Sequence, residues 1–425
     1  MSTSLPLKRI VTCQGSIQLI TAFSVMAYRE KVEGIAINDY ENYLVIYDLY
    51  APAEQIDDFI NLIKQIANSL CNWEAIVYIS AENLATTAAK LHHTKNSAFF
   101  AIVHNWVGTN TASEIYLSRN WQFGNELLIN TYKSAYKICY GDSIGLYFSA
   151  NSSAFFARQE VLPVTWKQKL FYFLVRLPKR FIRTLLNLIQ EGLGLKTLLK
   201  AIEFDRGYFT LPDVMGEMPS MNYEKINVCF LLATFQALID LVDADYVDHL
   251  KTDIADAPVA ILLTSNFSEA GRMSYENELS AYVQFLSSVH LTPDTILIIK
   301  PHPRDDLQKI EQLHTQLSKL FSQVIVLSQP ALFFLPFEVF FLKAFMTTGV
   351  GNTTASNSVQ VFGVSSACLS LKLLFQVPSV VGFGEGITSK TFYHDYIQGR
   401  SKHERDLSKA LQIIDSMSQV SNAVS

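Results

Sequence analysis

The sequence has few cysteines, and their spacing suits neither a disulfide framework nor a zinc site. Its 425 residues include five, an odd number, and no two of them form a CxxC pair. They are spread along the chain: Cys13, Cys71, Cys139, Cys229 and Cys368. Isolated cysteines of this kind are typical of reduced thiols in the cytoplasm. We therefore expect a cytoplasmic protein.

Charge is scarce as well. Charged residues make up 17% of the chain and hydrophobic residues 49%, and the formal net charge is -5 at pH 7. This composition can bury a large core, which excludes a disordered chain. A negative net charge is unsuited to a general binder of the phosphate backbone of nucleic acids. We expect a globular protein with no nucleic-acid partner.

No apolar run is long enough to span a bilayer. The most apolar segment, residues 331–346, is interrupted by Pro336, Glu338 and Lys343 and is shorter than the roughly 20 residues that a spanning helix needs. At the N-terminus an apolar stretch follows two basic residues, but polar residues interrupt it and no clear small-residue cleavage site follows. We expect a first buried strand and helix there, and no transmembrane helix.

Short motifs of metal and phosphate chemistry are also missing. There is no HExxH, no EF-hand loop and no GxxxxGK followed by serine or threonine. Asp243-Ala244-Asp245 has the form of a metal-binding DxD, but its place after an amphipathic segment favours a solvated helix end. The pair His92-His93 lacks acidic or cysteine neighbours and is interpreted as a surface pair. We expect no metal site.

Strand-like and helix-like segments alternate along the chain, which predicts parallel sheets with crossover helices. In the first half, strands are predicted at residues 9–12, 43–47, 73–79, 98–104, 115–117 and 135–140, and helices at 16–30, 53–70 and 125–132. In the second half, strands are predicted at 259–264, 295–299, 324–327 and 359–362, and helices at 274–288, 307–321, 337–345 and 366–375.

Two α/β domains follow from this pattern. An amphipathic helix is predicted at residues 230–246, and the polar stretch 243–256 marks the junction. We therefore expect an N-terminal domain over residues 1–250 and a C-terminal domain over 251–425. Ligands of open parallel sheets bind beyond the carboxyl ends of the strands, so a cleft between the two domains is the expected site.

A basic amphipathic helix is predicted as an insertion over about residues 164–204. Apolar residues recur there at helical spacing with Lys and Arg between them, and Pro178 should kink the helix. One interpretation is a solvated helix that covers the sheet or lines the cleft. The other is peripheral association with an anionic membrane through residues 166–185.

The strongest chemical signal is Lys300-Pro301-His302-Pro303-Arg304. It directly follows the apolar strand TILII, which places His302 on a loop at the carboxyl end of a strand. The two prolines restrict the backbone on either side. Histidine is suited to proton donation near neutral pH, and Lys300 and Arg304 add positive charge suited to a phosphate.

Hydroxyl and amide side chains follow two other predicted strands. Ser365 and Ser366 stand after strand 359–362 and a glycine, at the start of a predicted helix. A helix N-terminus offers free N–H groups and a positive dipole, which bind phosphate, although a serine N-cap without a ligand is common. Ser265 and Asn266 open the polar loop after strand 259–264 and are further candidates for binding a ligand.

Two carboxylates complete the candidate set. Glu338 lies inside the apolar stretch LPFEVFF, so it should be partnered, by a ribose diol or by the start of its own helix. Asp142 follows the apolar strand 135–140 between two glycines, where it could act as a base opposite His302 or simply form a turn. The same stretch, GDSIG, matches the GxSxG of serine hydrolases, but no helix is predicted directly after it.

Taken together, LIIKPHPRDD, LPFEVF, VFGVSSACLSLKLLF and CYGDSIGLYF resemble the bacterial sialyltransferase and polysialyltransferase-like families. The resemblance lies in an acidic D/E-D/E-G motif, an HP motif and a paired-serine motif in this order, and it covers the chain to about Phe375. It implies a GT-B-like fold with two Rossmann-like domains whose parallel sheets face a central cleft. At the acidic motif this sequence has Gly141-Asp142-Ser143, with one carboxylate and with serine in place of glycine.

The resemblance also implies roles and substrates. Asp142 would be the general base, His302 would act on the leaving phosphate, and Glu338 would hold the ribose of CMP. The paired serines would bind the phosphate, with Lys300, Pro303, Ser265 and Asn266 as further donor-binding residues. The implied reaction is inverting transfer of sialic acid from CMP-sialic acid to a glycan acceptor, with no metal and no cofactor.

Other functions fit the same pattern. Transfer of Kdo or another ulosonic acid from its CMP-sugar needs the same site. CDP-glycerol phosphotransferases share HP-type and paired-serine motifs, but typically place an aspartate before the serines, where this chain has Gly363 and Val364. A homologue without catalysis that binds glycans or membranes would keep the fold and lose nucleotide binding.

Overall fold

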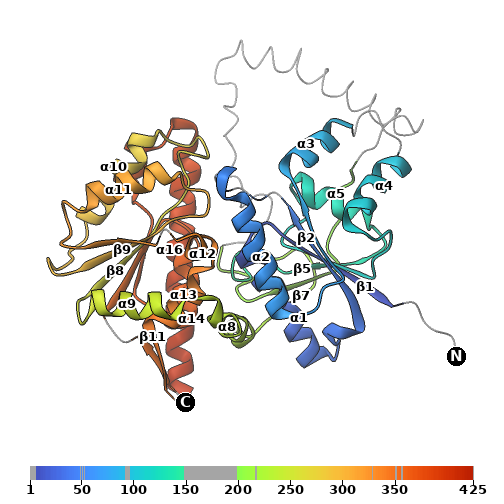
Figure 1. The fold of residues 1–425 in the computed structure, drawn as a ribbon, viewed down its shortest axis with the longest axis horizontal. Helices are drawn as coiled ribbons and strands as arrows, with labels where there is room; N and C mark the ends of the chain where they lie inside the picture. The colour runs from blue at the N-terminus through green and yellow to red at the C-terminus, as the bar shows by residue number, and fades with distance from the viewer. Residues whose placement is uncertain are drawn as a thin grey trace, which may run out of the picture.

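The chain forms two α/β domains that lie side by side (Figure 1). The computed structural model describes residues 6–47, 49, 51, 53–90, 96–147, 199–215, 218–327, 329–349, 352–355 and 358–424. The expected basic helix at 166–185 and the pair His92-His93 lie outside these residues. The two-domain α/β architecture predicted from the sequence is confirmed.

The N-terminal domain is built on a seven-stranded sheet in the order β3-β2-β1-β4-β5-β6-β7, in which every pair is parallel. Its strands are β1 (Leu7–Cys13), β2 (Tyr40–Tyr47), β3 (Ala75–Ile79), β4 (Glu114–Leu117), β5 (Tyr136–Cys139), β6 (Arg206–Phe209) and β7 (Tyr223–Lys225). Its α-helices among the described residues are α1 (Ser16–Tyr28), α2 (Ile56–Leu70), α3 (Ala81–Lys90), α4 (Asn96–Val107) and α5 (Phe123–Thr131).

One predicted strand is wrong. Residues 98–104 were expected to form a strand, but they lie inside α4. The buried side chains are Phe99, Val103 and Val107, which recur every four residues as on one face of a helix. A short apolar run does not distinguish a strand from a buried helix, and here the spacing of the buried residues decides for the helix.

The C-terminal domain has a five-stranded sheet in the order β10-β9-β8-β13-β14, again with every pair parallel. Its strands are β8 (Val259–Leu263), β9 (Ile296–Lys300), β10 (Val324–Val326), β13 (Val359–Gly363) and β14 (Ser379–Val381). Strands β8 and β9 are buried at every position, as expected for a parallel sheet covered on both faces. A separate hairpin is formed by β11 (Met346–Gly349) and β12 (Asn352–Ala355).

Helices cover this sheet and include a long C-terminal helix that sequence patterns did not predict. They are α10 (Tyr275–Ser287), α11 (Leu307–Leu317), α12 (Pro330–Phe334), α13 (Phe337–Phe345), α14 (Ala367–Phe375), α15 (Glu385–Thr391) and α16 (His394–Val424). No helix in the described part of the chain has the length and apolarity that a membrane span requires.

The predicted helix at 230–246 is two helices. Helix α8 (Val228–Gln236) packs against both α1 and α13, and α9 (Ala244–Ile254) packs against α13. Asp243 begins α9, because its carboxylate accepts the backbone N–H groups of Asp245 and Tyr246. The DxD segment is therefore a helix start and not the end of a helix.

A short helix, α12, connects the two domains. Its Phe334 carbonyl accepts a hydrogen bond from Ser16 Oγ, at the start of α1, at 2.9 Å. The Phe334 ring also stacks on Phe59 of α2, with 4.5 Å between ring centroids. Helix α12 thus belongs to the C-terminal domain in sequence but is fixed by side chains of the N-terminal domain.

Candidate active site

Three loops that carry predicted site residues leave adjacent strands at the carboxyl edge of the second sheet. The last residues of β9, β8 and β13 are paired in register, Lys300 with Leu263 and Leu263 with Gly363. The chain order changes direction between β8 and β13, which is the switch point where open α/β sheets bind ligands. The loops with His302 and the paired serines thus start about 10 Å apart, two strand spacings, with Ser265 between them.

The His302 loop is fixed by bonds of its own backbone. The His302 N–H lies 2.8 Å from Asp305 Oδ2 and 2.9 Å from the Thr264 hydroxyl oxygen. The Arg304 N–H donates to His302 Nδ1 at 3.1 Å, and the Asp305 N–H donates to the His302 carbonyl at 2.9 Å. Pro303 is half-buried within the same turn. The ring orientation is therefore set before any ligand binds.

These contacts determine which ring nitrogen of the neutral imidazole carries the proton. Because Nδ1 accepts the Arg304 N–H, the neutral ring must carry its proton on Nε2. Burial and then the nearby charges of Arg304, Lys300 and Lys309 hold the pKa of His302 well below its usual range. His302 is thus a neutral donor through Nε2–H, a form that can donate a hydrogen bond to a phosphate oxygen without first gaining a proton.

Ser365 and Ser366 stand at the N-terminus of α14, as predicted. Ser366 is the N-cap, yet its hydroxyl makes no capping hydrogen bond. The N–H groups of Cys368 and Leu369 already donate to the carbonyls of Ser365 and Ser366, at 3.4 and 2.9 Å. What this end offers is the positive end of the helix dipole and two half-buried hydroxyls. The arrangement suits an anion at the edge of the sheet.

A residue that the sequence did not reveal supports the serine loop. Arg400 of α16 is buried, and its Nη2 donates to the carbonyl of Val364 at 2.8 Å. Its guanidinium also lies over the ring of Phe267, 4.8 Å from the centroid, and pairs with Glu404 at 2.8 Å. No local sequence pattern indicates such a contact, because Arg400 comes from a helix far along the chain.

Lys300 and Glu338 are both used inside the protein. Lys300 Nζ donates to the carbonyls of Pro301 at 2.9 Å and Phe333 at 2.7 Å, which attaches the His302 loop to α12. Burial lowers the pKa of Lys300 to about 7. Glu338 is buried in the first turn of α13 and accepts the hydroxyl of Ser370, and burial raises its pKa. Both are partnered without a ligand.

The loop after β8 is partly buried as well. The Ser265 N–H lies 2.6 Å from the hydroxyl of Tyr282, and the Ser265 carbonyl accepts from Lys309 Nζ at 3.1 Å. Asn266 beside it is half-buried. The structure thus places both residues next to the His302 loop, with the backbone of Ser265 already satisfied.

Asp142 lies at the corresponding edge of the first sheet, directly after β5. Its turn closes on itself, because the N–H and C=O of Asp142 pair with the C=O and N–H of Leu146 at 2.8 and 2.9 Å. Gly141, Ser143 and Gly145 have φ of 78°, 50° and 78°, in the left-handed region. Ser143, which replaces the family's glycine, thus keeps a backbone conformation that favours glycine.

Arg119 and Gln18 hold the Asp142 carboxylate. Arg119 Nη2 lies 2.7 Å from Oδ2, and Gln18 Nε2 donates to Oδ1 at 2.8 Å. The Arg119 guanidinium also lies over Trp121, 4.9 Å from the ring centroid. Arg119 follows the predicted strand 115–117, so the rule that found Asp142 and His302, polar residues at carboxyl strand ends, would also have found it.

Contacts through α12 connect the two halves of the site. Gln18 and Ser16 belong to the first turn of α1, and Ser16 binds Phe334. The neighbouring Phe333 carbonyl accepts from Lys300, at the start of the His302 loop. The residues around Asp142 and those around His302 are therefore joined through a few direct contacts across the domain interface.

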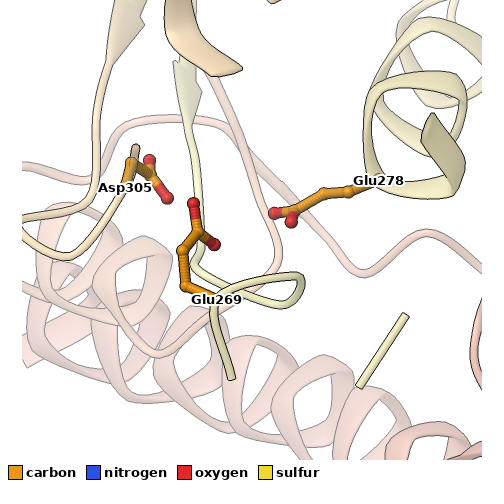
Figure 2. Close-up of side chains that lie close together, drawn as sticks. All are labelled: Glu269, Glu278 and Asp305. Carbon is orange, nitrogen blue, oxygen red and sulfur yellow. The ribbon is translucent and has the colours of Figure 1, made fainter. Parts of the chain in front are cut away.

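Three carboxylates of the second domain lie close enough to share a cation. Glu269, Glu278 and Asp305 each offer an oxygen within 4.8 Å of the others (Figure 2). The ammonium of Lys309 lies among them, 2.8 to 3.1 Å from each. The centre of this group is therefore occupied by a side chain of the protein.

Among solved structures, the fold is similar to several enzymes at low sequence identity. A putative UDP-N-acetylglucosamine 2-epimerase from Listeria monocytogenes is 12% identical, with coverage of 96% of this chain and 91% of that one and a TM-score of 0.45. The GT-B domain of a sialyltransferase from Photobacterium damselae is 11% identical, with coverage of 95% and 97% and a TM-score of 0.42. A 2,6-sialyltransferase from a Photobacterium species, in complex with CMP and lactose, is 10% identical, with coverage of 95% and 76% and a TM-score of 0.40.

The sequence itself identifies the family. No curated protein matches the chain. The model of the alpha-2,8-polysialyltransferase family matches residues 15–351, a span that includes Asp142, His302 and Glu338 and ends before the paired serines. The match covers well over half of the 425 residues. The chain therefore belongs to the alpha-2,8-polysialyltransferase family and is a glycosyltransferase.

Proposed function

We propose that this chain transfers sialic acid from CMP-sialic acid to a hydroxyl of a glycan acceptor, with inversion and without a metal ion. One observation carries the proposal within the family. A neutral His302 with its proton on Nε2 and a serine pair at a helix N-terminus stand on the loops after β9 and β13, two strand spacings apart at the same edge of the sheet. This set suits the single phosphate of a CMP leaving group.

On the leaving-group side, the bond between the sugar and the phosphate oxygen breaks and negative charge develops on the phosphate. The Nε2–H of His302 and the hydroxyls of Ser365 and Ser366 are donors that can offset this charge, and the positive end of the α14 dipole adds to them. The transition state at the sugar is oxocarbenium-like, as in other glycosyl chemistry. Glu338 remains the proposed ribose contact, through the oxygen that Ser370 does not bind.

On the acceptor side, Asp142 is the proposed general base. Direct attack by an acceptor hydroxyl on the face opposite the phosphate gives inversion, and Asp142 takes the hydroxyl proton as the new bond forms. The carboxylate is held by Arg119 and Gln18 in a turn that fixes its position. For the base to act, the acceptor hydroxyl must approach the exposed side of this carboxylate.

The absence of a metal requirement is part of the proposal. A single phosphate can be stabilised by neutral donors and a helix dipole, since less charge must be offset than in a diphosphate. The carboxylate group that could have bound a cation holds Lys309. Both points favour catalysis without Mg²⁺.

We also infer a cytoplasmic protein, from the free thiols of Cys13, Cys139 and Cys368. Peripheral association with the membrane through residues 166–185 is kept as a proposal. Flotation with anionic vesicles, compared with a variant that has its lysines in this segment replaced by glutamine, tests it.

Nucleotide binding tests the donor class. We expect CMP to raise the melting temperature more than CDP, UMP or UDP, and EDTA to leave the shift unchanged. At a hundred times its Kd, a ligand adds about 2.7 kcal/mol to the free energy of unfolding. Stabilisation by CDP alone would favour the CDP-glycerol phosphotransferase alternative. Stabilisation by none would favour a homologue without catalysis. If CMP stabilises the protein, turnover assays then separate CMP-sialic acid from CMP-Kdo.

Two variants test the roles of the catalytic residues. His302→Ala should lower kcat by about 100-fold or more, the usual cost of losing one such donor, and leave the melting temperature nearly unchanged. Asp142→Asn should keep CMP binding and lose transfer. Near-wild-type turnover in His302→Ala would contradict the mechanism, and loss of CMP binding in Asp142→Asn would assign that residue to the donor site instead.

A further inference from the structure

A buried lysine joins the two loops that carry His302 and Ser265. Lys309 lies in the first turn of α11 and is fully buried. Its Nζ is 2.8 Å from Asp305 Oδ1, 3.1 Å from Glu278 Oε1 and 2.9 Å from Glu269 Oε1. It also donates to the Ser265 carbonyl at 3.1 Å. An ammonium has three N–H groups, so these four acceptors use all of them.

The carboxylates around Lys309 hold the loops in turn. Asp305 binds the His302 N–H and the Thr264 hydroxyl through Oδ2. Glu278 accepts the backbone N–H of Ser268 at 2.7 Å and its hydroxyl at 2.6 Å. One ammonium therefore fixes, through two carboxylates, the loop after β8 and the loop after β9.

The buried carboxylates explain why replacing Lys309 by an apolar side chain should be unfavourable. Asp305 and Glu278 are fully buried, and carboxylates buried without a cation are strongly disfavoured. Burial raises the pKa of both, that of Asp305 to about 7, while Lys309 opposes this shift. Figure 2 shows that the three carboxylates point toward a common centre, as the ligands of a hard cation do.

We propose that Lys309 is a resident cation that holds the His302 loop in its catalytic position, in the place that a divalent ion would otherwise occupy. Lys309 is a positioning residue: it acts through Asp305 on His302 and through Glu278 on residues 265–268. The inference rests on the proposed function, because the residue that it positions is the proposed leaving-group donor.

The test compares Lys309→Ala with Lys309→Arg. We expect Lys309→Ala to lower kcat by about 100-fold, as small misplacements of catalytic groups do, with little change in KM for the CMP-sugar or in CMP affinity. Millimolar Ca²⁺ or methylammonium should raise the kcat of Lys309→Ala about 10-fold, because either cation can fill the vacated position. Lys309→Arg, which keeps the charge, should retain more activity than Lys309→Ala.

Lys402→Ala is the matched control, since Lys402 pairs with Asp406 at 2.9 Å in an exposed i,i+4 ion pair. It should behave as wild type and show no response to Ca²⁺ or methylammonium. A folded Lys309→Ala variant with wild-type kcat overturns the proposal. The proposal is also overturned if neither Ca²⁺ nor methylammonium raises the kcat of Lys309→Ala and if Lys309→Arg is no more active than Lys309→Ala.

Hydrogen exchange gives a readout that does not depend on transfer. In Lys309→Arg and in Asp305→Asn, amides of residues 264–268 and 300–306 should exchange faster than in wild type, and the first sheet should not change. Unchanged exchange in both loops contradicts the proposal. This test does not depend on Lys309→Ala, so it applies even if that variant fails to fold. A wild-type protein that transfers no sugar from any CMP donor defeats the proposed function alone, because the exchange result still decides the role of Lys309.

Discussion

At the scale of single residues, buried lysines of the second domain connect backbone segments through hydrogen bonds. Lys300 and Lys309 are both buried, and both donate to carbonyl groups of loops at the edge of the sheet. They differ in their partners: Lys309 has three carboxylates within 3.1 Å, whereas the bonds of Lys300 go to neutral carbonyls. The two ammonium groups should therefore respond to pH in opposite ways.

The pH dependence of stability tests the environment of Lys300. Its pKa is lowered from 10.5 to about 7, mainly by burial. Between these values the unfolded chain binds a proton that the folded protein has released, so the free energy of unfolding should rise with pH. Relative to Lys300→Met, the free energy of unfolding of the wild type should rise by up to about 1.4 kcal/mol per pH unit between pH 7 and 9.

Urea unfolding at pH 7, 8 and 9 measures this difference. Lys402→Met, which removes a charge from the exposed surface, is the control for the effect of net charge. Curves for the wild type and Lys300→Met that run parallel over this range would show that the ammonium of Lys300 is not disfavoured in the fold.

At the scale of elements, a candidate site could be proposed from the sequence because strand ends can be recognised. Asp142, His302 and Ser365 were found as polar residues directly after apolar strands, and the parallel sheets bring such positions to one edge. Their partners could not be found in this way. Arg400 and Lys309 act from helices, at positions where a buried charge and a solvated one look alike in sequence. Helix α4 was missed because its apolar run is short.

The turn that carries Asp142 gives a test at this scale. Gly145 has a φ of 78°, and a Cβ at this position would lie 2.9 Å from the Thr210 backbone nitrogen. Gly145→Ala should therefore cost more than the roughly 1 kcal/mol of the backbone conformation alone, and should lower transfer by displacing Asp142. Gly34→Ala is the control, because Gly34 has a φ of 71° but open space around it.

Denaturant unfolding and initial rates of transfer measure the two effects. Equal destabilisation by Gly145→Ala and Gly34→Ala would mean that the turn shifts freely to admit the methyl group. Full activity in Gly145→Ala would mean that the position of Asp142 does not depend on this turn.

At the scale of the whole molecule, the stack of Phe59 on Phe334 should contribute to the energetic coupling of the two domains. A double-mutant cycle with Phe59→Leu and Phe334→Leu should give a coupling of about 1 kcal/mol, as aromatic pairs do. The stack of Phe341 on Phe375, inside the second domain, is the reference pair, with 5.1 Å between centroids. Urea unfolding of the four proteins in each cycle gives both values. Additive effects at Phe59 and Phe334 beside a normal coupling in the reference pair would mean that this stack does not couple the two domains.

Helix α12 is held by Ser16 and Phe59 on one side and by Lys300 on the other. A change in the angle between the domains must therefore move the loop of His302, or else break these contacts. In the proposed mechanism, an acceptor that binds against the first domain would in this way adjust His302, the proposed donor to the leaving CMP. The activated sugar would then be cleaved mainly when an acceptor hydroxyl is in place, which would protect it from wasteful attack by water.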